Sequence, residues 1–281
     1  MIEQARARIR RAGTRRQIQG VMRGKNRHVK VGLDDHEVDL SLLVSQAARR
    51  LADDSIEMQW LQYVFQLSGT AVAALNGLAS KSVHTQARSV RMVGALRMEQ
   101  AVPWVAMLLN SPEPVVADAA ARALGRIGGW RSAQALSTAI QRIGPRVTLI
   151  TALARSAPDL FLEAGLSGGQ RPVVLSSMAM AAGLRRRHTA VGPLLALLVS
   201  GNRHQRVVSC RSLGWIGART AVPMVTAALA DREWRVRVAA AKALGAFRTA
   251  RSKAEIEALL ADRNPRVRRA AQQALRMLEG R

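Results

Sequence analysis

The chain repeats a pattern of about 31 residues, and this periodicity restricts its fold more than any other feature. Most copies contain a small residue, an apolar residue and an anchor, as in ARALGRIGG, CRSLGWIGA and AKALGAF. The anchors are Gly94, Gly125, Ala154, Gly183, Gly214, Gly245 and Arg276, spaced 29 to 31 residues apart. Seven copies therefore span roughly Thr70 to Leu278.

Each copy is predicted to be an antiparallel pair of helices. Two apolar segments, such as AVPMVTAAL and WRVRVAAAKALGAF, are joined by a polar turn, and neither alternates as a strand would. Pro114 and Pro265 stand where a first helical position is expected, and Pro103 and Pro223 open leading helices in the same way. Twelve residues before the anchors, the predicted N-cap residues are Ser82, Glu113, Asn202, Glu233 and Asn264.

These segments resemble the HEAT repeat, particularly its bacterial form that also occurs in phycobilisome-lyase-like proteins. The closest matches are Val236-Arg237-Val238-Ala239-Ala240 with Ala243-Leu244-Gly245, and Val267-Arg268-Arg269-Ala270-Ala271 with Ala274-Leu275. The copies anchored at Ala154 and Gly183 depart from the pattern. The resemblance implies an all-α fold, a right-handed α-solenoid (superhelix) of about seven HEAT-like antiparallel helix pairs. Members of this family share no common substrate or activity, so the resemblance predicts neither for this chain.

The helical period separates a core face from an outward face in each second helix. Val236, Ala240, Ala243 and Leu244 fall on one arc and are predicted to be core. At the edge of that arc, one set of residues resembles the interior ladder of the family, in which an Arg meets a turn Asp of a neighbouring repeat. The predicted ladder is Arg206, Arg237, Arg268, Asp231 and Asp262.

The outward face contains the candidate binding residues. In HEAT-like solenoids the second helix lines the concave surface, so the resemblance implies a groove along these positions. The residues in question are His84, Arg91, Arg122, Thr151, Val173, Met180, His204, Arg211, Arg235, Lys242 and Arg266. We expect the groove to be basic at both ends and neutral to apolar in the middle, which suits a protein partner better than an unbroken polyanion.

Charge divides the chain into three predicted parts. Residues 1–33 hold ten Lys or Arg and one acid, and we expect a basic N-terminal arm in which four glycines interrupt any long helix. Residues 34–69 hold seven acids and two bases and are predicted to be a divergent acidic helical cap. Residues 70–281 are the repeat region. The formal charge of the whole is +24, yet 38 of the 43 bases are Arg, a skew that a GC-rich genome can also produce.

The sequence favours a cytoplasmic location, alternatively at the inner face of the membrane. The Arg-rich N-terminus lacks the apolar core of a signal peptide. The uncharged run Met58 to Ser80 contains several Gln, Ser and Thr residues, so we expect a helical hairpin that turns at Ser68-Gly69. Cys210 is the only cysteine, which excludes an intramolecular disulfide.

No pattern of catalytic residues is present in the sequence. The five histidines are scattered without a metal-ligand spacing, and the Gly-rich stretch Gly165–Gln170 lacks the ending of a phosphate loop. We therefore predict no enzymatic activity, no metal, no cofactor and no small-molecule substrate. Cys210 is expected to be a small packed residue.

The function predicted from the sequence is a non-enzymatic protein-binding scaffold, whose concave groove holds an acidic partner segment with an apolar centre. One alternative is a nucleic-acid-binding HEAT-like protein that uses the basic arm and the groove ends. HEAT-like DNA glycosylases would be its enzymatic form, but the groove positions contain neither an acid nor an aromatic residue. Another alternative is a scaffold at an anionic membrane surface, because residues 1–33 resemble a polybasic juxtamembrane segment.

Overall fold

The computed structural model describes residues 2–280, and every regular element within them is helical, as the sequence predicted. None of the described helices is both long and apolar enough to cross a membrane. The α-helices are α1 (Ile2–Met22), α2 (Leu40–Ala48), α3 (Ile56–Leu67), α4 (Thr70–Gly77), α5 (Val83–Ala95), α6 (Val102–Leu108), α7 (Pro114–Ile127), α8 (Gly129–Ile143), α9 (Val147–Ser156), α10 (Asp159–Ser167), α11 (Pro172–Leu184), α12 (Val191–Ser200), α13 (Arg203–Ile216), α14 (Val222–Ala227), α15 (Trp234–Phe247), α16 (Lys253–Ala258) and α17 (Pro265–Leu278).

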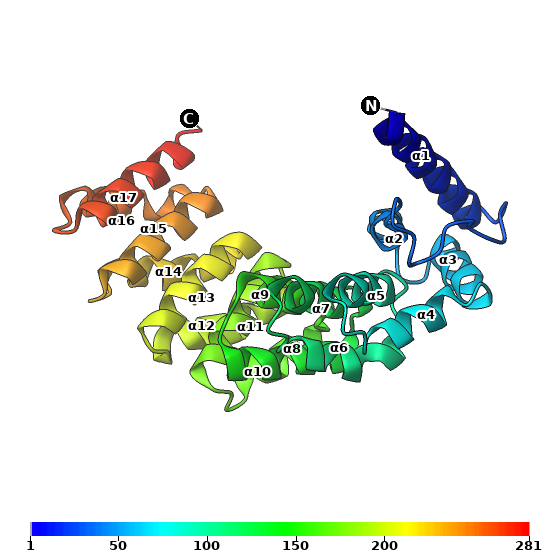
Figure 1. Ribbon diagram of the computed structural model, residues 1–281. Coiled ribbons are helices and arrows are strands. Elements are labelled where there is room, and N and C mark those ends of the chain that lie inside the picture. The colour runs from blue at the N-terminus through cyan, green and yellow to red at the C-terminus, as the bar shows by residue number, and fades with distance from the viewer. Residues whose placement is uncertain (1, 281) are drawn as a thin grey trace. The chain divides into compact units, whose positions relative to one another are not determined.

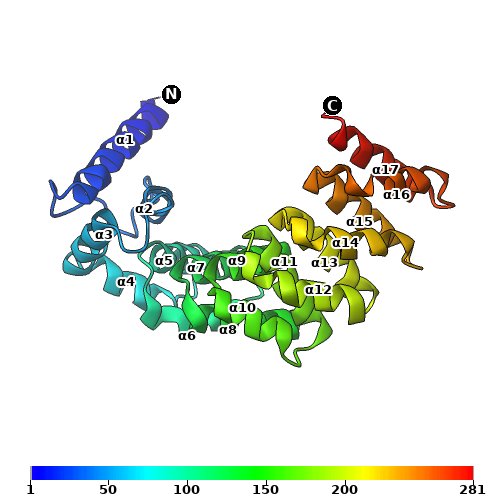
Figure 2. The same cartoon turned by 180° about the vertical axis from the view of Figure 1, so that it is seen from behind.

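The helices form two compact units that divide after Ala139, within α8. The first unit contains α1 to α7 and most of α8. The second contains the end of α8 and α9 to α17 (Figures 1 and 2). The boundaries predicted at residues 33 and 69 both lie inside the first unit, in the loop before α2 and in the turn before α4.

Each unit is a stack of helix pairs. The anchors lie on α5 and α7 in the first unit and on α9, α11, α13, α15 and α17 in the second. Within each unit these second helices pack on one another in chain order, and shorter first helices such as α4, α6, α12, α14 and α16 pack against their own second helix (Figures 1 and 2). This is the α-solenoid arrangement, in which each pair is stabilised by its neighbours.

The second helices begin where the sequence predicted, and Ser82, Asn202 and Asn264 cap them with their side chains, whereas Glu113 and Glu233 form no side-chain cap. All five predicted N-cap residues directly precede a second helix, and Pro114 and Pro265 occupy the first helical position. Asn202 forms a capping box with Gln205, in which each side chain accepts from the other residue's backbone N–H. The predicted hairpin turn also occurs: α3 ends at Leu67, and Gly69 adopts a left-handed conformation with φ of 73° before α4.

The anchor glycines allow the second helices to approach closely. A Cβ added at Gly94 would lie 2.6 Å from the Cα of Ala123, and one added at Gly183 would lie 2.7 Å from the Cα of Ser212. Ala123 and Ser212 each precede the next anchor along the chain by two residues. The small residue of one repeat therefore packs on the glycine of the repeat before it.

The predicted core face is buried. Val236, Ala240 and Leu244 on α15 are fully buried, and Ala243 is 2% exposed. Because the alanines on this face are small, neighbouring second helices can pack at the short separation that the glycines permit.

The prediction that glycines interrupt any long helix within residues 1–33 is wrong. α1 continues through Gly13 and Gly20, and Thr14, Ile18 and Val21 on one of its faces are buried. This face packs on α2 and α3. A glycine within a helix costs about 1 kcal/mol, and burial of two aliphatic side chains more than offsets that cost.

The acidic segment binds the basic segments on either side of it. Arg10 of α1 forms ion pairs with Asp35, at 2.8 Å, and with Glu37. Arg97, after α5, lies 2.8 Å from the carboxylate of Asp53. Ion pairs therefore join residues 34–69 to α1 on one side and to the turn after α5 on the other.

Candidate functional site

The second helices of the C-terminal unit present two rows of basic side chains. His204, Arg235 and Arg266 occupy one repeat position on α13, α15 and α17, and all three are exposed. Arg211 and Lys242 occupy the position seven residues further along α13 and α15, and both are exposed. Seven helical residues span about 10 Å, so the two rows run in parallel at about that separation.

On α13 and α15, the outward bases differ from Arg203, Arg206 and Arg237 because they have no acidic partner. Among the described residues, no ion pair involves His204, Arg211 or Lys242. The nearby ladder residues Arg206 and Arg237 are neutralised by aspartates, as described next. The available positive charge of α13 and α15 is therefore concentrated on the outward face.

The ladder residues join successive repeats. Arg206 donates two hydrogen bonds to Asp231, at 2.8 and 3.0 Å, and Arg237 donates two to Asp262, at 2.7 and 2.9 Å. The side chains of Arg237 and Asp262 are each 8% exposed. Arg268, in the last repeat, donates to the backbone carbonyl oxygens of Asp262 and Arg263, at 2.8 and 3.3 Å. Within the described residues it has no carboxylate partner.

These contacts lower the pKa of the ladder carboxylates. The hydrogen bonds from Arg237 are the main cause of the lowered pKa of Asp262, and they outweigh burial, which acts in the opposite direction. Because the pKa of Asp262 is lower in the folded chain than its ordinary value of 3.8, the ionised carboxylate stabilises the fold at pH values above 3.8. That stabilisation is lost as the pH falls through the lowered value.

Two of the outward bases lie against the ring of Trp234. The guanidinium carbon of Arg235 is 4.4 Å from the centre of the Trp234 ring, and that of Arg266 is 5.0 Å from it. Both distances allow cation–π attraction of about 0.5 to 1 kcal/mol. Trp234 was not among the predicted binding residues, although it directly precedes Arg235 and the repeat period places Arg266 on the neighbouring helix.

The middle of the predicted groove lies in the same unit. Thr151 on α9 is exposed, and Val173 and Met180 on α11 are half-buried. Because α9, α11 and α13 pack in succession, this neutral and apolar surface adjoins the basic rows. The C-terminal unit alone thus contains a basic region next to an apolar one.

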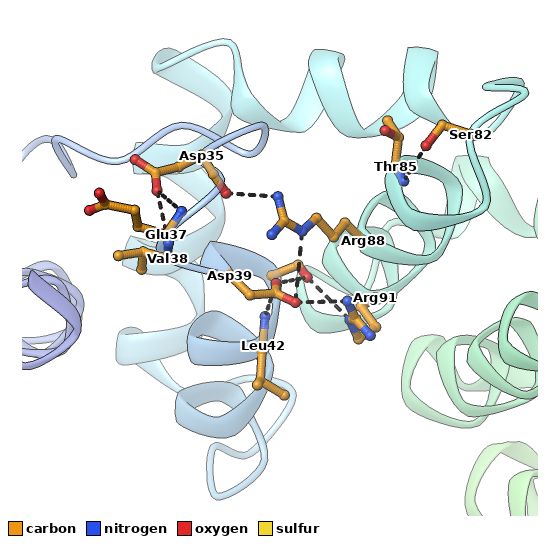
Figure 3. A network of polar contacts seen from close by, with 10 residues as sticks. Asp35, Glu37, Val38, Asp39, Leu42, Ser82, Thr85, Arg88 and Arg91 are labelled. Carbon is orange, nitrogen blue, oxygen red and sulfur yellow. Dashed lines mark hydrogen bonds and ion pairs between the residues drawn. The ribbon is translucent and has the colours of Figure 1, made fainter. Parts of the chain in front are cut away.

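The outward residues of the N-terminal unit are less available. Arg91 donates to Asp39, at 2.8 Å, and to Ser41, at 3.2 Å, and its side chain is 28% exposed (Figure 3). Arg122 is exposed but lies 3.6 Å from Asp118 on the same helix. His84 is exposed at the start of α5. Packing of α2 on α5 therefore converts Arg91 into an internal contact.

Asp39 is a residue that the sequence interpretation missed. Its carboxylate caps α2 by accepting from Leu42 N–H, and it also binds Arg91 and lies 3.8 Å from the Nε of Arg88. Burial raises the pKa of Asp39, but the hydrogen bonds from the Ser41 hydroxyl and Leu42 N–H, together with the charges of Arg91 and Arg88, lower it overall. The available signal was the position of Asp39 directly before an apolar run, where an N-cap residue is expected.

Cys210 is fully buried on α13, and burial raises the pKa of its thiol to about 12. At pH 8 only about one thiol in ten thousand is therefore ionised in the folded chain. We expect a thiol-specific reagent to modify Cys210 at pH 8 only after unfolding, with one reactive thiol per chain in guanidinium chloride. Rapid modification of the native protein, followed by absorbance or mass, would contradict this placement.

Among the described residues, no group of three or more His, Cys, Asp or Glu side chains is arranged to hold a metal ion. The HEAT-repeat sequence pattern matches residues 71–154 and 191–276. No curated protein matches the sequence.

Several solved structures resemble the chain. One is human deoxyhypusine hydroxylase in complex with glycerol, which is 19% identical over 96% of this chain and 98% of that one, with a TM-score of 0.39. Another is YibA of Escherichia coli, 15% identical over 87% and 97% of the two chains, with a TM-score of 0.40. An engineered protein is 16% identical over 95% and 97%, with a TM-score of 0.31.

Proposed function

The chain belongs to the HEAT-repeat family, and from that premise we propose that it is a non-catalytic scaffold that binds an acidic segment of a partner protein. The binding surface is the outward face of α13, α15 and α17. The observation that carries the proposal is the set of exposed bases without acidic partners on these helices, beside the ladder arginines Arg206 and Arg237, which aspartates neutralise. We call the set His204, Arg211, Arg235, Lys242 and Arg266 the basic face.

The spacing of the basic face indicates what kind of segment would fit. Neighbouring helices lie about 8 to 10 Å apart, and an extended peptide advances about 3.3 Å per residue. An acidic side chain at every third residue would therefore meet one base on each successive helix. Such a segment crosses the helices and continues onto the neutral and apolar surface of α9 and α11.

The proposal favours a protein partner over a nucleic acid because, at the outward repeat positions of the C-terminal unit, the positive charge is limited to α13, α15 and α17. A non-specific polyanion gains affinity from each phosphate neutralised, so it would benefit from charge that continues along α9 and α11. The residues at the outward repeat positions of α9 and α11 carry no charge; they are Thr151, Val173 and Met180. The proposal includes no catalysis, and it is supported on one point: the single cysteine is packed in the core with a raised pKa and so offers no thiolate nucleophile.

Reversing two charges of the basic face is expected to weaken binding of an acidic peptide at least about tenfold, or about 1.4 kcal/mol. The variant is Arg211→Glu/Lys242→Glu, and the probe is a labelled peptide with Glu at every third position followed by an apolar run. Fluorescence anisotropy at physiological ionic strength measures the dissociation constant. A salt series then separates the electrostatic part of the affinity.

The matched control is Arg219→Glu/Arg251→Glu, which changes the net charge equally. These two arginines are exposed in the turns that lead into α14 and α16. We expect the control to change affinity less than about twofold. Equal losses in both variants would mean that net charge alone attracts the peptide, contrary to the proposal. Tighter binding of duplex DNA, lost in the first variant only, would favour the nucleic-acid alternative.

A further inference from the structure

A cavity of about 590 Å³ opens in the N-terminal unit, where the loop before α2 meets the starts of α4 and α5. Its volume lies within the range of small-molecule sites. The cavity is rich in hydroxyl groups, which come from Ser68, Thr70, Ser82 and Thr85. Its lining residues belong to the N-terminal unit, whereas the basic face belongs to the C-terminal unit.

Two helices begin at the cavity. α4 starts at Thr70 and α5 at Val83, and the residues around both starts line it. The first turn of a helix has backbone N–H groups without helical partners and carries partial positive charge. The one side-chain cap at these two starts is the 3.4 Å bond from Thr85 N–H to Ser82 Oγ, so most of these donors are unused within the described residues.

Arg88 provides a charged side chain to the same cavity and is almost fully buried. Its side chain is 7% exposed, and Nη1 donates to the backbone oxygen of Asp35 at 2.8 Å (Figure 3). Its Nε is buried without a hydrogen-bond partner among the described residues. The nearest carboxylate, that of Asp39, is 3.8 Å from Nε and lies closer to Arg91, at 2.8 Å. Arg88 therefore contributes a buried positive charge to the cavity lining, and this charge is shared with the backbone oxygen of Asp35 and, at longer range, with Asp39.

We propose that this cavity binds a small phosphorylated molecule. The phosphate lies at the starts of α4 and α5 within reach of Arg88, where it accepts hydrogen bonds from backbone N–H and hydroxyl donors. A phosphate suits this set better than a carboxylate because it has more acceptor oxygens and up to two negative charges. The cavity exceeds the size of a phosphate alone, and Asp34 on its lining accepts hydrogen bonds from hydroxyl or amino groups in the rest of the ligand.

Isothermal titration calorimetry of the full chain at physiological ionic strength tests the proposal. The probes are inorganic phosphate, ribose 5-phosphate and AMP, with ribose and adenosine as the matched compounds without phosphate. A substitution of Arg88 would be ambiguous, because it would remove both the proposed phosphate contact and the hydrogen bond to the backbone oxygen of Asp35. The decisive variant is instead His84→Glu, which adds negative charge to the cavity lining at an exposed position in the first turn of α5. A glutamate is well tolerated there because its negative charge complements the partial positive charge at the start of a helix.

Val115→Glu is the matched control, since Val115 occupies the same repeat position at the start of α7 and is exposed outside the cavity. We expect a phosphorylated probe to bind with a dissociation constant below about 1 mM. His84→Glu should weaken that binding at least about tenfold, and Val115→Glu less than about twofold. Equal effects of the two variants, equal binding of the probes with and without phosphate, or no binding of any probe would overturn the proposal.

Discussion

Replacing Gly94 with alanine is expected to lower the free energy of unfolding by about 2 to 3 kcal/mol. The added Cβ would lie 2.6 Å from the Cα and 2.7 Å from the Cβ of Ala123. Both are atoms that cannot move away without shifting α5 and α7, which pack closely in the N-terminal unit. Urea unfolding followed by circular dichroism measures the change.

The matched control for this substitution is Gly13→Ala in α1. Gly13 also lies inside a helix of the N-terminal unit, but no atom lies within 4 Å of the position its Cβ would take. Alanine favours a helix by up to about 1 kcal/mol relative to glycine, so this variant should be as stable as the parent chain or more stable. If Gly94→Ala were equally harmless, the close approach of α5 and α7 would not depend on the glycine.

Replacing Arg237 with alanine is expected to cost about 3 kcal/mol of folding free energy. The substitution removes two hydrogen bonds to Asp262 and leaves that carboxylate buried without its cation. It also removes the donor to the backbone oxygens of Asp231 and Arg232. Denaturant unfolding at pH 7, where Asp262 is ionised, measures the loss.

Arg268→Ala provides the comparison within the same chain. Arg268 occupies the equivalent position on α17 and also donates to two backbone oxygens, but it has no carboxylate partner among the described residues. We expect a cost of about 1 kcal/mol, the usual value of a hydrogen-bonded group that is not part of a buried ion pair. Equal costs for the two variants would show that the link between Arg237 and Asp262 adds nothing to the backbone contacts.

The repeat period, the starts of the second helices and their core face could be predicted because they depend on residues close together in the sequence. A cap such as Asn202 satisfies N–H groups two or three residues away, and the burial of Val236 and Ala240 follows from helical periodicity. The continuous helix α1 could not be predicted in this way. Its glycines argue locally against it, and the decisive contribution comes from packing against α2 and α3.

The candidate sites show the same division. Equivalence of repeat positions identified the basic face, but it did not identify Trp234 beside Arg235 and Arg266, because that contact joins two helices. The cavity beside Arg88 also has no local signature, since it is formed by a loop and the starts of two helices.

Arg91 and Arg211 illustrate what each level of structure determines. The sequence by itself placed both residues three positions before an anchor, on the outward face of a second helix. Tertiary structure alone decided their availability: α2 brings Asp39 to within 2.8 Å of Arg91, whereas no acid among the described residues pairs with Arg211. The physical reason is that helical periodicity sets the direction of a side chain, but its neutralisation depends on an opposite charge that only the folded chain brings near.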